Sequence, residues 1–155
     1  MSGLNTEGLE NFKVPVLPRG KYEFEVMRGA DCEGNSQDEN GEKSSGWDFT
    51  LQVVGPDTAT LSDGNSALGY TFRQRIWFPR EGLKKRKPQI AARMTKTTIQ
   101  FMAAAFGTVP VGTVYGKDFE HTRFLGTGRP QYDSFQKEDI FEIETPEPLV
   151  PEAQA

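Results

Sequence analysis

The chain has 155 residues, which suits a single domain, and its aromatic fraction of 11% exceeds that of most disordered chains. No stretch approaches the roughly 18 apolar residues of a membrane span, and the N-terminus lacks the pattern of a secretory signal. A single cysteine excludes an internal disulfide, and a single histidine argues against a Cys/His zinc site. We therefore expect a cytoplasmic protein without membrane contact, structural metal or cofactor.

The charges are distributed unevenly along the chain. The formal net charge is -4, but six of the 22 acids and none of the 18 bases follow Lys137. Nine of the 18 bases lie within residues 73–96, where Glu81 is the one acid. This basic band is more informative about partners than the net charge of the whole chain.

The first part of the chain predicts two strands joined by a long loop. Residues 1–18 read as an extended lead-in. Residues 20–27 and 47–53 alternate apolar with polar side chains, which is typical of half-buried strands, and Trp47 falls on the apolar face. Residues 30–46 are rich in Gly, Asn, Ser and acids, and are expected to form an exposed loop.

Residues 69–78 predict a third strand with two unlike faces. One face is apolar and is expected to enter the core, whereas the other carries Arg73, Arg75 and Trp77 at steps of roughly 7 Å. Single-stranded nucleic acid needs cations for its phosphates and flat rings on which its bases stack. The alternative is a solvated face whose Trp77 packs beneath a loop, but the basic band beyond the strand favours nucleic acid.

One helix and two strands are expected in the remainder of the folded region. Pro88 suits the first turn of a helix, and apolar residues at helical spacing predict an amphipathic helix that ends at Gly107. Strands are expected at residues 117–125 and 131–136, separated by a turn at residues 126–130. The order predicts a mainly β fold, a five-stranded Greek-key OB-like barrel with one helix between strands three and four, although other small folds share this order.

The acidic end of the chain has two open interpretations. As a flexible polyanion it would compete with DNA for the basic band and, once displaced, bind replication or recombination proteins. Alternatively, apolar residues around Phe141 complete the barrel, and only the stretch from Thr145 is disordered. The expected divisions are an extended lead-in (1–18), an OB-like nucleic-acid-binding domain (19–137) and an acidic flexible tail (138–155).

The candidate nucleic-acid-binding residues are Trp77 and cations of the third strand, the basic band and the later turn: Arg73, Arg75, Trp77, Arg80, Lys84, Lys85, Arg86, Lys87, Arg93, Lys96 and Arg129. Residues 84–87 are expected to be mobile, because four adjacent cations repel one another. Tyr132 and Phe135 could extend a stacking platform, but completion of the core is favoured. Glu23 and Glu25 disfavour a DNA surface on the first strand.

No signature of catalysis is present. The chain has no phosphate-binding loop of the G-x-x-x-x-G-K-[ST] type, and no Glu-x-Lys or Asp-x-Lys pair of the kind that metal-dependent nucleases use. Cys32 lies in an acidic stretch without a basic neighbour to lower its pKa, so a reactive thiol is not expected. His121 is expected on a strand surface. We therefore expect a binding protein rather than an enzyme.

Five segments in order carry a resemblance to a known family. They are the strands "LPRGKYEFEV", "GWDFTLQVV" and "YTFRQRIWF", the helix "TTIQFMAAAFG", and a final hairpin with an acidic end. Over residues 17–141 the chain resembles phage-encoded single-stranded DNA-binding proteins of the OB-fold type. The resemblance implies coating of single strands in replication or recombination, partner contacts through the acidic tail, and DNA binding by Arg73, Arg75, Trp77 and residues 84–87. The chain ends in Ala155, where many such tails end in an aromatic residue.

Two other classes of function remain open. A phage structural or protein-interaction module could use the same small barrel, with the basic band as a docking patch for an acidic partner. A nuclease with unrecognised metal ligands is the third and weakest reading of the sequence.

Overall fold

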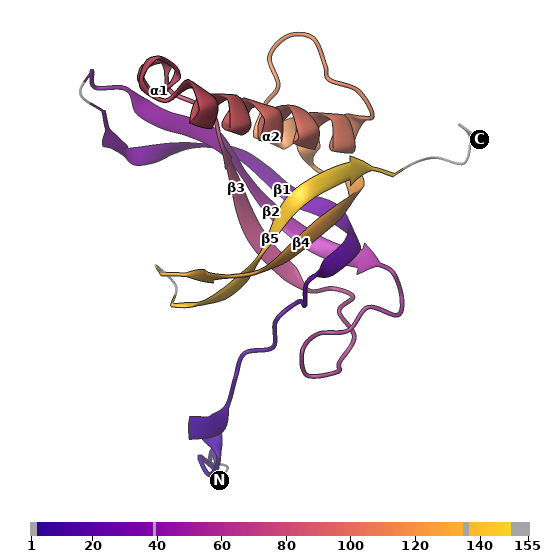
Figure 1. The fold of residues 1–155 in the computed structure, drawn as a ribbon. Helices are drawn as coiled ribbons and strands as arrows, with labels where there is room; N and C mark the ends of the chain where they lie inside the picture. The colour runs from indigo at the N-terminus through magenta and orange to yellow at the C-terminus, as the bar shows by residue number, and fades with distance from the viewer. Residues whose placement is uncertain (1–2, 39, 135–136, 150–155) are drawn as a thin grey trace.

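The computed structural model describes residues 3–38, 40–134 and 137–149. Its centre is one antiparallel sheet in the order β3-β2-β1-β4-β5 (Figure 1). The strands are β1 (Gly20–Gln37), β2 (Lys43–Gly55), β3 (Thr71–Trp77), β4 (Arg123–Asp133) and β5 (Glu138–Pro148). The helices are α1 (Glu81–Arg86) and α2 (Pro88–Phe106), with short 3-10 turns η1 (Leu9–Asn11) and η2 (Gly116–Phe119). The mainly β class is confirmed, but no backbone ladder joins β3 to β5, so the sheet is not closed.

The core is aromatic and lies on the inner face of the curled sheet. Phe24 of β1 packs edge-on against Phe72 of β3, with ring centroids 5.5 Å apart, and lies 5.9 Å from Phe141 of β5. Burial of these rings brings the two edge strands towards each other around β1. Trp47 is buried beside Phe49, which confirms its expected place in the core.

Helix α2 covers the core and begins where Pro88 suggested. Pro88 occupies the first turn, and Gly107 ends the helix in the left-handed conformation with φ 76°. Phe101 is fully buried against Phe49 and Phe124. The prediction of a single helix is wrong, because α1 occupies the basic connector. Its acid lies in the first turn and its bases in the last, which complements the helix dipole.

The prediction of a loop at residues 30–46 is wrong. β1 and β2 continue as a paired arm as far as the Gln37–Lys43 pair, and this arm projects at the upper left of Figure 1. Both faces of the arm are polar because it extends beyond the core. A strand without a buried face has no apolar alternation, so its sequence looks like that of a loop.

The expected turn at residues 126–130 is also wrong, because β4 runs through it. A Cβ atom at Gly126 would lie 2.8 Å from the ring of Phe24, so the glycine permits a close approach between strands. A bulge between Thr127 and Gly128 follows in the pairing with β5. The start of the strand expected at 117–125 is η2 instead, and β4 begins at Arg123.

The flexible tail expected from residue 138 is wrong for residues 138–148, which form β5. Phe141 is 1% exposed and Ile143 is also buried, which agrees with the alternative that residues around Phe141 complete the core. The disorder which that alternative expected from Thr145 is wrong for residues 145–148, because the strand continues to Pro148. Five of the six acids of the expected tail lie in this strand, so the segment cannot act as a flexible polyanion. Residues 150–155 lie outside the described residues.

Candidate nucleic-acid interface

The two faces of β3 differ as the sequence predicted. Phe72 and Ile76 are buried, whereas Arg73 and Arg75 are exposed and Trp77 is half-buried. The inward and outward positions alternate along the strand, so the two arginines and the indole share the outer face of the sheet.

Asp48 of β2 holds both arginines of this face. Arg73 donates through its Nε and Nη2 atoms to the Asp48 carboxylate, and Arg75 Nε lies 3.5 Å from Asp48 Oδ2. The hydrogen bond with Asp48 raises the pKa of the Arg73 guanidinium. One carboxylate therefore fixes the position of two cations and neutralises part of their charge.

Arg28 of β1 is a member of this face that the sequence analysis missed. It pairs in register with Thr50, as Arg73 does from the other side, and lines a hollow of about 210 Å³ with Arg73 and Asp48. A register shift between Val26 and Arg28 turns Arg28 outward. Strict alternation from residue 26 would turn it inward, so no signal in the sequence could have placed it. We call Arg28, Arg73, Arg75 and Trp77 the basic face.

Lys84, Lys85 and Arg86 of the connector lie on α1, beside the β1–β2 arm, and Arg80 directly precedes the helix. Arg80 Nε donates to Ser44 Oγ of β2 at 2.9 Å, and Lys84 Nζ lies 2.8 Å from Glu81 Oε1. Lys85 and Arg86 line a small hollow with Asp38 and Asn40 at the tip of the arm. Lys87, Arg93 and Lys96 are exposed at the start of α2 and along it.

Arg129 is not part of the basic face. It lies on β4, where it is paired in register with Glu142, and its Nε atom is 3.4 Å from Glu144 Oε1. Tyr132 on the same strand is 65% exposed, so its expected place in the core is wrong. Phe135 lies outside the described residues.

A side chain bridges the two edge strands where no backbone ladder does. Gln74 Nε2 donates to the Ile143 carbonyl at 2.9 Å, and the Ile143 N–H donates to Gln74 Oε1 at 2.8 Å. Hollows of about 470 and 390 Å³ flank this bridge, and Arg75 and Glu142 line both. Trp77 and Glu144 also line the smaller one. We call the two hollows together the β3–β5 groove.

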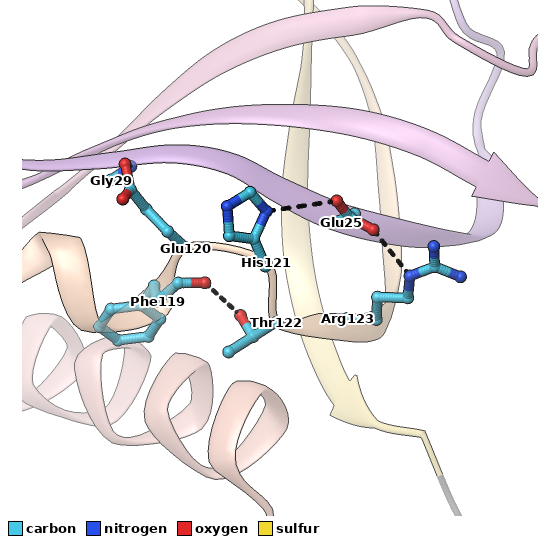
Figure 2. A network of polar contacts seen from close by, with 7 residues as sticks. All are labelled: Glu25, Gly29, Phe119, Glu120, His121, Thr122 and Arg123. Carbon is cyan, nitrogen blue, oxygen red and sulfur yellow. Dashed lines mark hydrogen bonds and ion pairs between the residues drawn. The ribbon is translucent and has the colours of Figure 1, made fainter.

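The acids on the first strand are engaged by neighbouring basic groups. Figure 2 shows Glu25 between His121 and Arg123, with its carboxylate 2.8 Å from Arg123 Nε and 3.7 Å from His121 Nδ1. Arg123 also reaches Glu23 at 3.8 Å. His121 is exposed as expected, but in a turn with φ 68° rather than on a strand. Arg123 thus neutralises part of the negative charge of Glu23 and Glu25.

Cys32 lies on the arm in a less acidic setting than its sequence suggests. Burial, followed by Asp48, raises the pKa of the Cys32 thiol, while Arg75 and Arg73 act in the opposite direction. A raised pKa favours the protonated thiol at neutral pH, which agrees in direction with the expectation that it is unreactive.

The comparisons with known proteins do not assign this chain to a family. No protein-family model matches the chain, and a search of curated proteins finds no match. Within the described ranges, none of the helices is long and apolar enough to cross a membrane. In the same residues, no group of three or more His, Cys, Asp or Glu side chains could hold a metal ion.

Proposed function

We propose that this protein binds single-stranded DNA without sequence specificity and coats it during phage replication or recombination. The observation that carries the proposal is the arrangement of the basic face. Cations and an indole ring stand together on one exposed sheet surface, and these are the two kinds of group that a single strand requires. The protein acts here as a binding protein, not as an enzyme.

The topology supports an OB-like barrel as the scaffold. The order β3-β2-β1-β4-β5 becomes the closed order of an OB fold if β3 meets β5, and the Gln74–Ile143 bridge joins those two strands. OB folds bind nucleic acid on the face of strands two and three, between the loops that follow strands one and four. In Figure 1 the paired strands of the β1–β2 and β4–β5 hairpins both extend to the left of the molecule.

In the bound state, the phosphates lie along Arg28, Arg73 and Arg75, and a base stacks on Trp77. The exposed cations of α1 and α2 extend the positive track beyond β3. Each phosphate that a protein cation neutralises releases condensed counterions from the strand, which makes the slope of log K against log salt more negative by roughly 0.7. Since Asp48 already occupies both β3 arginines, a phosphate must compete with its carboxylate.

A protein-interaction module is the second candidate, and one surface favours it. The loop between α2 and η2 exposes Val109, Val111 and Tyr115, and Val111 is fully exposed. Apolar side chains that gather on a surface often mark protein contacts. In this case the basic face would dock an acidic protein instead of DNA.

The test is a titration of a fluorescently labelled strand of mixed sequence, compared with the same strand annealed to its complement. We expect tighter binding of the single strand, and quenching of Trp77 fluorescence over a background from Trp47. The double variant Arg73→Ala, Arg75→Ala should weaken binding at least tenfold. Lys117→Ala serves as the control. Lys117 is exposed, but it belongs to η2, which packs on the inner face of the sheet and so lies away from the basic face. Equal affinity for duplex, or no binding at low salt, would overturn the proposal.

A further inference from the structure

The β3–β5 groove has two walls of opposite charge. Arg73 and Arg75 line it from β3, whereas Glu142 and Glu144 line it from β5. Phosphates are attracted to the first wall and repelled by the second. A single strand that follows the β3 arginines must therefore present something other than its backbone to β5, and the bases are the groups that remain.

The groove offers a base one flat ring and two polar groups of opposite kind. Trp77 lines the smaller hollow and supplies a surface for stacking. Arg75 supplies donors and Glu142 supplies acceptors in both hollows. Gln74 is already engaged through both its Oε1 and Nε2 atoms with Ile143, so its amide is committed to the bridge. Hollows of about 470 and 390 Å³ fall within the roughly 300–1,000 Å³ of small-molecule sites.

Glu142 is poorly hydrated for a carboxylate. Its side chain is half-buried, and burial followed by the nearby Glu144 raises the pKa of its carboxyl, while Arg129 acts in the opposite direction. A carboxylate in this position gains from an N–H donor, because its lost hydration is then replaced by a charge-assisted hydrogen bond.

Nucleobases differ in how well they can provide that donor. Cytosine, adenine and guanine carry exocyclic amino groups at the edge of the ring. Thymine and uracil carry carbonyl oxygens instead, and their one ring N–H donor, at N3, lies between two of these oxygens. A carboxylate accepts hydrogen bonds from amino groups and repels carbonyl oxygens. Resting on the proposed function, we propose that the β3–β5 groove binds bases with an exocyclic amino group and disfavours thymine and uracil, with Glu142 as the discriminating residue.

This preference is one of base composition and not of sequence. The phosphates still bind the basic face whatever bases they join, so coating continues along any strand. Occupancy is then expected to be highest on stretches poor in thymine.

The test compares oligo(dC) with oligo(dU) of equal length by fluorescence anisotropy at neutral pH and fixed salt. These strands share their backbone and differ at the base edge, where cytosine has an amino group at C4 and an acceptor at N3, and uracil has a carbonyl oxygen at C4 and an N–H at N3. We expect oligo(dC) to bind roughly tenfold more tightly. Equal affinities, or a preference for oligo(dU), would overturn this inference while leaving the proposed function intact. Failure of both strands to bind, together with failure of the mixed-sequence strand, would overturn both.

A pair of variants assigns the preference to one side chain. Glu142→Gln introduces an amide that can donate to a carbonyl oxygen, so the ratio of the two affinities should fall to about twofold or less. Glu147→Gln is the matched control, since Glu147 lies on β5 but pairs with Lys21 at 2.8 Å outside the groove. The control should keep the wild-type ratio. A ratio that falls equally in both variants would show a general charge effect and contradict the role of Glu142.

Discussion

β3 and β5 are the two edge strands of one sheet, and they carry opposite charges to the same groove. β3 has an apolar inner face and a basic outer face, and the alternation of its sequence predicts both. β5 holds five acids in eleven residues, a composition typical of a flexible acidic tail. Phe141 and Ile143 are its side chains in the hydrophobic core, and Pro146 is also buried. The difference shows that a few apolar residues at strand spacing determine structure even where charge dominates composition.

The largest effect is expected when β5 loses Phe141, the side chain that packs deepest in the core. Phe141→Ala should lower the free energy of unfolding by about 3–5 kcal/mol, because the ring is fully buried among Phe24, Phe72 and Tyr22. Urea unfolding followed by circular dichroism measures the change. Tyr132→Ala on the neighbouring strand is the control and should change stability by less than about 0.5 kcal/mol. Wild-type stability in Phe141→Ala would mean that β5 is not part of the core.

Gln74→Leu should destabilise the fold by about 1–3 kcal/mol. The variant leaves the Ile143 N–H and carbonyl without the partner that the bridge provides. Thermal unfolding measures the loss, and Gln52→Leu on the outer face of β2 provides a control of the same chemistry. If the two variants melt alike, the bridge contributes nothing to the joining of β3 and β5.

Asp48→Asn should tighten the binding of single-stranded DNA by up to about fivefold at low salt. The substitution removes the carboxylate that competes with phosphate for Arg73 and Arg75, and an exposed ion pair is worth at most roughly 1 kcal/mol. The gain should shrink as salt rises. Asp57→Asn, in the turn after β2, controls for the change in net charge. Weaker binding by Asp48→Asn would instead show that the carboxylate positions the arginines for their ligand.

The smallest effect on stability is expected from changes in α1 and in Lys87, which follows it. Replacement of Lys84, Lys85, Arg86 and Lys87 by Ser should reduce the salt dependence of DNA binding, because these exposed cations contribute charge rather than shape. The melting temperature should stay within a few degrees of wild type, since α1 has no buried residue. A large loss of stability would show that these residues hold α2 in place. An unchanged salt slope would remove them from the interface.

The sequence was most informative where one face of an element is buried. The faces of β3, the burial of Trp47 and the two ends of α2 at Pro88 and Gly107 follow from alternation and helix-end chemistry. Prediction of the arm failed because neither of its faces is buried. Prediction of β4 failed because Gly126 looks like a turn residue, although it serves a close contact with Phe24.

Only part of the candidate site could be predicted. Arg73, Arg75 and Trp77 share a face because alternation is local, and the sequence carries that information. Arg28 joins them through a register shift, and Glu142 lies opposite β3 because the Gln74–Ile143 bridge joins two strands that are far apart in the chain. Arg129 was expected in a turn, whereas the pairing of β4 with β5 places it beside Glu142 and Glu144. Contacts that depend on the register between two strands cannot be predicted from the spacing of residues within one strand.

The bridge formed by Gln74 also bears on the solubility of the protein. The free edge of a sheet exposes backbone donors and acceptors that can pair with a strand of another molecule, and such pairing is a common start of aggregation. Here the amide of one side chain satisfies the Ile143 backbone on β5 as a neighbouring strand would. A chain that lost this amide would expose that point of the edge to every other copy nearby, so its first defect at high concentration would be self-association.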